Sequence, residues 1–486
     1  MKVLKYLLIG VAVLLLAGVV AYFAWFHNPY EHTLKLDPTS VYADRGEGFI
    51  LTNANIIDVE SGRLSEAQHL FIRDGEIAGI FEGSVPDSLL DAYQLTNAEG
   101  RYIMPAMIDM HAHLNTGGLI PPDESGRLMA LEQYARYGVG LIFTLGGHGF
   151  NQEVTLDLIR KQQNREVVGP VIYATGDFFT APGGYPIAMI SMMNNVSVDN
   201  IDLNEEGILA IDEETDLDLL ISIQKEMGMK GIKVMVETGL GGGPDEPRIS
   251  TELIRNIVEI ASEHGLIVFA HVSRQGDFED AINAGVNVLV HTVGDQLLEK
   301  AEPFFEMMKE KPIYYTPTLS IAYVPHYIKT GKLLDDPFML QYSSDRTVRS
   351  LQNWLVNRLM LSMLEFDAES VEENMVQNFV HFHQAGVPVL MGADAGNPSV
   401  IPGYSAHREL MYMAAGGMSI ADVLRSATIE PARFLRLDDS MGSIAEGKTA
   451  SFLLLDRNPL EDVRNTQSIH RVMLEGYWIE KSSVKR

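Results

Sequence analysis

The stretch Gly100-Arg-Tyr-Ile-Met-Pro-Ala-Met-Ile-Asp-Met-His-Ala-His113 is an apolar run that ends in two histidines separated by a single residue. Side chains at positions i and i+2 of a β-strand point to the same face of the sheet. We therefore expect His111 and His113 to leave the end of one buried strand side by side. Because neutral imidazole is the commonest metal ligand in proteins, the pair indicates a metal site if other strands supply further ligands.

Outward from this stretch, short apolar runs alternate with helical segments along the chain. The runs span residues 140–144, 171–174, 231–235, 266–270, 286–290 and 387–391. Between two of them, Ser250 can cap a helix whose apolar stripe runs to Ala261 and which ends at Gly265. Alternation of this kind predicts an α/β fold in which parallel β/α units close into a (β/α)8 barrel of the TIM type. The active site of such a barrel lies at the carboxyl ends of its strands.

Both ends of the main body are rich in strands instead. Residues 49–57, 69–72 and 76–80 are strand-like, with a tight turn at Asp74-Gly75, and residues 451–455 and 471–474 return to the same pattern. We expect these two ends to pair into one small composite β-sandwich. The predicted domains are therefore a β-sandwich formed by residues 47–103 and 436–486, and a barrel formed by residues 104–435.

The amino-terminal segment is apolar and different in kind. Residues 6–26 carry no charge and follow Lys2 and Lys5, which predicts a transmembrane helix within residues 1–26. The two lysines predict that the body lies outside the cytoplasm, in a periplasmic or extracellular space. The alternative is a signal peptide cleaved near Ala21, which would give a secreted protein. Residues 27–46 are mixed and polar, which predicts a linker.

Composition narrows the classes of partner and of metal site. The chain has 486 residues and a net charge of −28, from 65 acidic and 37 basic side chains, so it would repel nucleic acid and anionic lipid surfaces. We interpret the acidic surface as a source of solubility, with the steering of cationic substrates as the alternative. There is no cysteine. Any metal must then bind to histidine, carboxylate or modified lysine, which suits zinc in a catalytic site.

Four further polar residues stand at or near the ends of predicted barrel strands. His271 ends Leu-Ile-Val-Phe-Ala-His, His291 ends Val-Asn-Val-Leu-Val-His, Asp394 follows Val-Leu-Met-Gly-Ala, and Lys233 lies within Gly-Ile-Lys-Val-Met. Each residue alone has an ordinary structural explanation, such as a hydrogen-bonded core histidine or a helix cap. Buried charge must be compensated, however, and four strands that each deliver such a residue to the same end of a barrel favour one shared site.

These motifs resemble those of the amidohydrolase superfamily, and within it the imidazolonepropionase-like and prolidase-like metallohydrolases. The resemblance runs from about Gly48 to Gly476 and includes the stretch 104–113, Gly392-Ala-Asp-Ala-Gly396 and the glycine-rich signature 442–448. It implies that His111, His113 and Asp394 hold one divalent ion and that His271 and His291 hold a second, with zinc as the expected metal. It also implies that Lys233 takes up CO2 and becomes a carbamate that bridges the two ions.

The resemblance further implies a metal-bridging hydroxide that attacks a carbonyl, with Asp394 as the general base and then the general acid. The expected substrates are small molecules with an amide bond, namely a dipeptide, an N-acyl amino acid or a cyclic amide. A lactone or organophosphate ester hydrolase is the alternative, and a non-catalytic surface binding protein is a third reading. Nothing in the sequence predicts the oligomeric state.

Two candidate substrate contacts lie in predicted loops at the same end of the barrel. The family's Gly-Gly-His motif is Gly183-Gly184-Tyr185-Pro186 here, so Tyr185 stands where the family has a histidine. His148 follows the second barrel strand and would hydrogen-bond a substrate carbonyl or carboxylate, with a structural loop histidine as the alternative. The glycine-rich segment 239–244 lacks the Gly-Lys-Ser/Thr of a phosphate-binding loop and is expected to give slack to a loop over the site.

Overall fold

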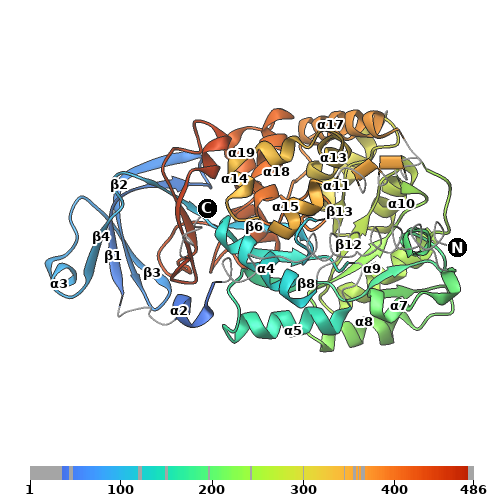
Figure 1. Ribbon diagram of the computed structural model, residues 1–486, viewed down its shortest axis with the longest axis horizontal. Coiled ribbons are helices and arrows are strands. Elements are labelled where there is room, and N and C mark those ends of the chain that lie inside the picture. Colours follow the sequence, from blue (N-terminus) through green and yellow to red (C-terminus); the bar gives the residue numbers. More distant parts are fainter. Residues whose placement is uncertain are drawn as a thin grey trace, which may run out of the picture.

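In this computed structural model the chain consists of a barrel and a smaller β-sheet domain at one end of it (Figure 1). The described residues are 36–42, 48–118, 123–147, 151–194, 197–240, 243–298, 300–343, 345–353, 357–358, 361–362 and 367–479. Within these ranges, no helix combines the length and the apolar character needed to cross a membrane. The predicted transmembrane segment, residues 1–26, lies outside the described residues.

Parallel strands close the barrel in the order in which they occur along the chain. One sheet joins β6, β7 and β8, and a second joins β11, β12, β13 and β14. A bridge between Thr175 and Gly231 connects the two sheets on one side. The barrel strands are β6 Met107–Ala112, β7 Val139–Thr144, β8 Val171–Ala174, β11 Gly231–Met235, β12 Ile267–His271, β13 Val288–Val290 and β14 Tyr314–Thr316. The strands β9 Phe178–Thr180 and β10 Ile208–Ala210 extend the second sheet beside β11.

The last predicted barrel strand, residues 387–391, closes the ring, but it is not a regular strand. Val389 bridges to Tyr315 on β14, and Ala395 bridges to Ala112 on β6. Backbone hydrogen bonds run to both neighbours, from Tyr315 N to Pro388 O at 3.0 Å and from Met110 N to Met391 O at 2.9 Å. Pro388 has no N–H to donate, so it interrupts a regular ladder of backbone hydrogen bonds in this segment. The segment 387–395 therefore completes the eight-fold ring that the alternating pattern predicted.

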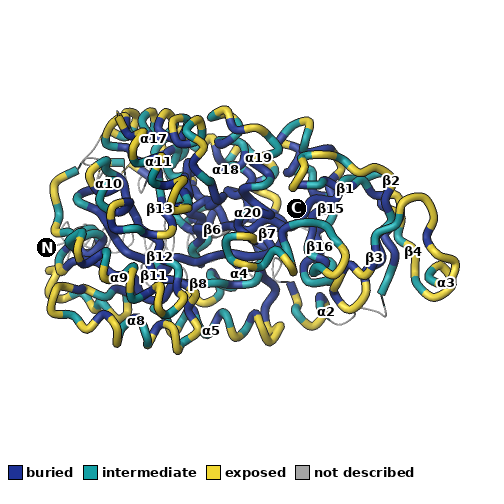
Figure 2. Tube along the Cα trace, turned by 180° about the vertical axis from the view of Figure 1, so that it is seen from behind, coloured by how far each residue is buried: buried dark blue, intermediate teal, exposed yellow. Residues whose placement is uncertain are grey.

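Helices cover the outside of the barrel, and the buried strands lie inside them (Figure 2). The predicted helix after Ser250 is α9 Thr251–Glu263, where the Ser250 side chain accepts a hydrogen bond from Leu253 N. Its apolar stripe, which includes Leu253, Ile254 and Ile257, is buried against the strands. The other helices of the barrel are α4 Glu124–Arg136, α5 Gln152–Gln163, α6 Ile187–Asn194, α7 Leu203–Glu206, α8 Leu217–Glu226, α10 Gln275–Ala284, α11 Glu302–Glu310, α12 Leu319–Ala322, α13 Val324–Thr330, α14 Pro337–Leu340, α15 Asp345–Leu351, α17 Ala368–Gln384, α18 Tyr404–Ala415, α19 Ile420–Ser426 and α20 Ile429–Phe434, with 3-10 turns at Val198–Asn200 and Lys332–Asp335.

Strands from both ends of the body share one sheet. β15 pairs antiparallel with β5, with Phe452 opposite Pro105 and Leu454 opposite Ile103. The strands that we predicted as a sandwich are thus hydrogen-bonded into one continuous eight-stranded sheet. Its members are β1 Phe49–Asp58, β2 Arg63–Arg73, β3 Glu76–Glu82, β4 Gln94–Asn97, β5 Tyr102–Pro105, β15 Phe452–Leu455, β16 Ile469–Leu474 and β17 Tyr477–Ile479; a short helix α3 Asp87–Leu90 precedes β4, and the 3-10 turn η4 Val463–Gln467 precedes β16.

Part of the predicted linker is packed rather than extended. Residues 38–42 form the short helix α2 Pro38–Tyr42, and the ring of Tyr42 meets that of Tyr477 edge-on at 5.0 Å. Leu36 and Val41 are also buried. This described stretch of the predicted linker therefore packs against the sheet domain, where burial of its apolar side chains is favourable.

Candidate metal centre and active site

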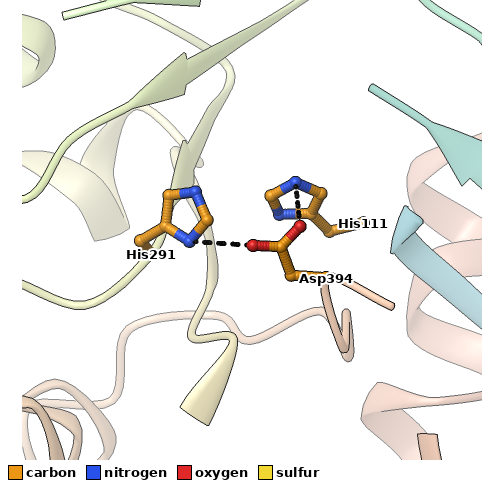
Figure 3. A group of neighbouring side chains, drawn as sticks. All are labelled: His111, His291 and Asp394. Carbon is orange, nitrogen blue, oxygen red and sulfur yellow. Dashed lines mark ion pairs between the residues drawn. The ribbon is translucent and has the colours of Figure 1, made fainter. Parts of the chain in front are cut away.

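Asp394 lies at the middle of the histidine cluster that the sequence predicted. One of its oxygens, Oδ1, is 3.2 Å from Nε2 of His111, and the other, Oδ2, is 3.7 Å from Nδ1 of His291 (Figure 3). Oδ1 also lies 2.8 Å from Nε2 of His113. Ligand atoms of His111, His291 and Asp394 all fall within 4.8 Å of one another. These residues come from β6, from the end of β13 and from the closing segment, so the barrel brings together three distant parts of the chain.

Backbone and amide groups fix the orientation of this cluster. His113 places Nδ1 against the carbonyl oxygen of Gly146, which leaves Nε2 directed toward Asp394. Asn397 donates from Nδ2 to Oδ1 of Asp394 at 2.8 Å. Asp394 has a φ of +56°, a left-handed conformation that non-glycine residues seldom adopt outside turns and functional sites. The carboxylate is therefore held at a defined position rather than free to rotate.

His271 stands between a carboxylate and an aromatic ring. Its Nε2 is 3.1 Å from Oε2 of Glu237, and the ring of Tyr185 stacks on it at 5.1 Å. On its other side, the ring of His291 meets it edge-on at 4.5 Å. Burial raises the pKa of Glu237, but hydrogen bonding and the charge of His271 outweigh it, so the net pKa lies below the ordinary value. Glu237 is thus an anion that can hold one ring nitrogen of His271 and leave Nδ1 available to a metal ion.

Lys233 is buried in the middle of β11 with an unpartnered amine. Its side chain is 3% exposed, and among the described residues Nζ has no hydrogen-bond partner. Burial lowers the pKa of this amine to about 7, while the charge of Asp394 acts in the opposite direction. A buried ammonium ion without a partner is costly, so the neutral amine is the form that fits this position.

Two of the histidines, His111 and His291, are also suited to the neutral form. Burial, together with the nearby Lys233 and the other histidines, lowers the pKa of His111 well below its ordinary value, and the pKa of His291 falls for the same reasons. Neutral imidazole is the form that binds metal. Nδ1 of His291 lies 2.7 Å from the hydroxyl of Thr318, so its Nε2 is left for another contact. Four imidazoles, one carboxylate and the buried amine of Lys233 fit a site for divalent ions.

Asp109 ties the first strand to the closing segment behind the ligands. One oxygen, Oδ1, accepts hydrogen bonds from the backbone N–H groups of His111 and Ala393, both at 3.1 Å. The side chain is fully buried, and burial raises its pKa to about 7. Gly392 packs closely against its neighbours, because a Cβ atom at this position would fall 2.4 Å from Thr316 and 2.9 Å from His111. The two segments that carry His111 and Asp394 are therefore in close backbone contact.

The structure brings together His111, His113, Lys233, His271, His291 and Asp394, which are the six predicted ligands. Tyr185, predicted to contact substrate, lines the same cavity. His148 lies outside the described residues. Glu237, Thr318 and Asn397 were missed by the sequence reasoning. For Glu237 a signal existed, because it lies four positions after Lys233 and side chains of an extended chain at that spacing share a face.

The fold and the site define an α/β barrel with a histidine-rich site that can hold metal at the carboxyl ends of its strands. The model of the amidohydrolase family matches residues 102–479. The chain therefore belongs to the amidohydrolase family. This membership confirms the predicted class, a hydrolase that acts on carbon–nitrogen bonds, and members of the family are typically metal-dependent.

Individual relatives cover almost the whole chain at low identity. Ochratoxinase from Aspergillus niger is 24% identical over 466 residues, which cover 90% of this chain and 87% of the relative. Among solved structures, a Xaa-Pro dipeptidase with bound methionine in its active site has a TM-score of 0.70 at 21% identity, and the match covers 89% of this chain and 100% of that one. A putative prolidase from Bifidobacterium longum has a TM-score of 0.68 at 24% identity over 90% and 96% of the two chains. These structural matches support the barrel fold.

Proposed function

We propose that this chain is a binuclear metal-dependent hydrolase that cleaves an amide bond. The single observation that carries the proposal is the convergence of four imidazoles, one carboxylate and the unpartnered amine of Lys233 at one end of the barrel. The family of the chain and the names of its relatives, an ochratoxinase and prolidases, favour an amide among the bonds that such a site could cleave.

The residues divide between two ion positions as follows. His111, His113 and Asp394 would hold one divalent ion, and His271 and His291 would hold the other, with zinc as the proposed metal. Burial lowers the pKa of Lys233 to about 7, so its amine is mainly neutral above that pH and would react with CO2 to form a carbamate, which would supply the missing anionic ligand between the two positions. When bound, two such ions supply a hydroxide at neutral pH and polarise a carbonyl group.

The chain's own residues would then position the substrate and move the proton. Asp394, held by Asn397, would accept a proton from the attacking water and deliver it to the nitrogen of the leaving amine. The net reaction adds one water, because the C–N bond breaks, the hydroxyl group goes to the acyl carbon and the proton goes to the amine. Tyr185, stacked on His271 at the cavity wall, would contact the substrate near the scissile bond. His148 is a second proposed contact.

The location of the enzyme is a separate proposal. The uncharged residues 6–26 support an amino-terminal membrane anchor with the catalytic domain on the extracytoplasmic side. Secretion after cleavage of a signal peptide is the alternative outcome. Mass determination of the amino terminus after expression in a host with a functional secretion pathway distinguishes them, because cleavage near Ala21 would remove most of the apolar segment.

The function is tested by the metal content and activity of Lys233→Ala. We expect the native chain to bind about two ions, and the variant to lose most of its metal and amidase activity because the bridging ligand is gone. A short-chain carboxylic acid should restore part of the activity by occupying the same place. Lys230→Ala, which removes an exposed lysine just before β11, is the matched control and should behave as the native chain. Full activity in Lys233→Ala would exclude the carbamate. Less than one ion per native chain after addition of zinc and bicarbonate would exclude the binuclear site.

A further inference from the structure

The ligand cluster forms part of a cavity whose remaining wall is mostly apolar. The cavity has a volume of about 360 Å³ and lies at the carboxyl ends of the barrel strands. This volume is within the range of sites that hold small organic molecules. Away from the cluster, its wall is built from side chains such as Phe178, Met189, Leu240, Ile321, Val371 and Met375. Methionines adapt their shape to irregular apolar ligands, so this wall suits a hydrophobic group.

The described part of the cavity wall offers no cation to a substrate beyond the ligand cluster itself. Its ionisable residues are the six proposed metal ligands and Tyr185. The other polar side chains on the wall, Ser273, Thr292 and Asn397, are uncharged. A carboxylate in a water-poor cavity needs a guanidinium, an ammonium or several N–H donors to replace its hydration. The described part of the wall does not supply that set.

Two nearby cations are engaged elsewhere. Arg274 follows the wall residue Ser273, but its guanidinium donates to the carbonyl oxygens of Gly239 and Gly243 and pairs with Asp245 at 2.7 Å. Its charge is therefore used to hold Gly239, Gly243 and Asp245. Lys329 lies on α13, just beyond the wall residue Pro325, and its amine pairs with Glu369 at 3.0 Å. Neither residue lines the cavity.

Helix α17 presents an apolar face to the cavity. The first half of α17 places Ala368, Val371 and Met375 along the cavity, at the spacing of one helix face. Glu369, Glu372 and Glu373 lie between them in the sequence. None of these three carboxylates lines the cavity, and Glu369 pairs with Lys329 at 3.0 Å. The described side chains that α17 presents to the cavity are therefore all uncharged and apolar.

We propose that the cavity binds an uncharged, apolar amide, in which neither the acyl part nor the amine part carries a carboxylate. This inference rests on the proposed amide hydrolysis and narrows its substrate class. It disfavours dipeptides and N-acyl amino acids, which the sequence left open. The scissile carbonyl would face the ligand cluster, and the apolar part would lie against Met189, Val371 and Met375.

The test uses two compounds that differ only in the carboxylate, N-benzoylphenethylamine and N-benzoyl-L-phenylalanine. With the zinc-loaded full chain, we expect kcat/KM for the neutral compound to exceed that for the acid by at least about tenfold, because the acid must bury an unpaired charge. Calorimetry on the same protein should also show tighter binding of the neutral compound. Equal or better turnover or binding of the acid would overturn the inference. Absence of hydrolysis of both compounds would count against the proposed function, and the binding order would still decide the inference.

Two variants of the protein test the same preference between the neutral compound and the acid. Val371→Arg adds a cation to the cavity wall and should shift the preference toward the acid by at least about tenfold. Gln377→Arg adds the same charge at an exposed position on the same helix and should leave the preference unchanged. Circular dichroism of both variants confirms that α17 is intact. An unchanged preference in a folded Val371→Arg protein would contradict the proposed position of the substrate.

Discussion

Glu237 holds one ring nitrogen of His271 at 3.1 Å, and it accepts a second hydrogen bond from Gly239 N at 2.8 Å. A carboxylate at this place fixes which nitrogen of the imidazole carries the proton and which faces a metal ion. The two hydrogen bonds give Glu237 a fixed orientation, so it acts through His271 and has no need to touch the substrate.

We expect Glu237→Gln to weaken metal binding by about 10- to 100-fold while the fold is kept. The amide would still accept the bond from Gly239 N, but its NH2 group would face the N–H of His271 and favour the wrong tautomer. Competition with a chelator measures the affinity. Glu263→Gln, at an exposed position of α9, is the control. An affinity equal to that of the native chain would show that Glu237 has no positioning role.

The hydrogen bonds that Asp109 accepts should stabilise the folded chain. Removal of its side chain in Asp109→Ala leaves the buried N–H groups of His111 and Ala393 without an acceptor, which should cost about 2–4 kcal/mol of unfolding free energy. In Asp109→Asn, one oxygen can still accept both bonds, so we expect a much smaller cost. Urea denaturation measures both values. Similar costs for the two variants would mean that the hydrogen bonds are not the source of the stabilisation.

The residues that could be predicted from the sequence are those that follow an apolar strand. His271 and His291 end such runs, and the barrel geometry then places them together. Thr318 and Asn397 could not be found in this way, because each lies in a turn whose backbone path decides where the side chain points. Thr318 has a φ of +49°, and its hydroxyl reaches His291 only through that turn.

At the scale of elements, α18 is held to its neighbours by a buried histidine. His407 is fully buried, with Nε2 at 2.8 Å from the carbonyl oxygen of Tyr137 and Nδ1 at 3.0 Å from the hydroxyl of Thr466. These contacts join α18 to the end of α4 and to η4. Burial lowers the pKa of His407 to about 4, and the bond to Tyr137 acts in the opposite direction.

This pKa predicts how stability changes with pH. In the unfolded chain, a histidine titrates near its ordinary value of about 6.5, so the unfolded state binds the proton first as the pH falls. The contribution of His407 is therefore complete above that pH and is lost progressively down to about pH 4, by about 3 kcal/mol. Urea denaturation between pH 7 and pH 4.5 should show a shallower fall in His407→Gln than in the native chain. A parallel fall would contradict the assignment.

The structure of the closing segment 387–395 could be predicted only in part from its sequence pattern. Its run Val-Pro-Val-Leu-Met predicts a buried strand, and the segment does lie between β14 and β6. The pattern does not reveal that only isolated bridges form or that Asp394 has left-handed backbone. Both features depend on the neighbouring strands, which the local sequence does not encode.

At the scale of the whole molecule, β15 joins the β-sheet domain to the barrel. Its side chains alternate, so that Phe452 and Leu454 enter the core of the sheet domain while Leu453 and Leu455 enter the core shared with the barrel. Pairing of the two ends of the body could be expected from their strand-like composition. The register of β15 against β5 could not, because it depends on contacts across about 350 residues of chain.

The contact between the two parts can be tested at Gly138, which precedes β7. Gly138 has a φ of +80°, and a Cβ atom there would lie 2.5 Å from Cγ of Leu453 on β15. Gly285, after α10, has a similar φ of +85° but no atom within 4 Å of the same position. Alanine at either site pays the cost of a left-handed conformation, about 1 kcal/mol, but only at Gly138 does it also collide with the neighbouring strand.

We therefore expect Gly285→Ala to lose about 1 kcal/mol of unfolding free energy, and Gly138→Ala to lose about 2–4 kcal/mol. The difference between the two variants isolates the packing of Leu453 against the start of β7, because the backbone cost is shared. Urea denaturation measures both values, and Gly138→Ala should cost less in a Leu453→Ala background than in the native chain, because the collision is then absent. Equal losses in the two single variants would mean that β15 yields freely and that the sheet domain does not brace the barrel at this point.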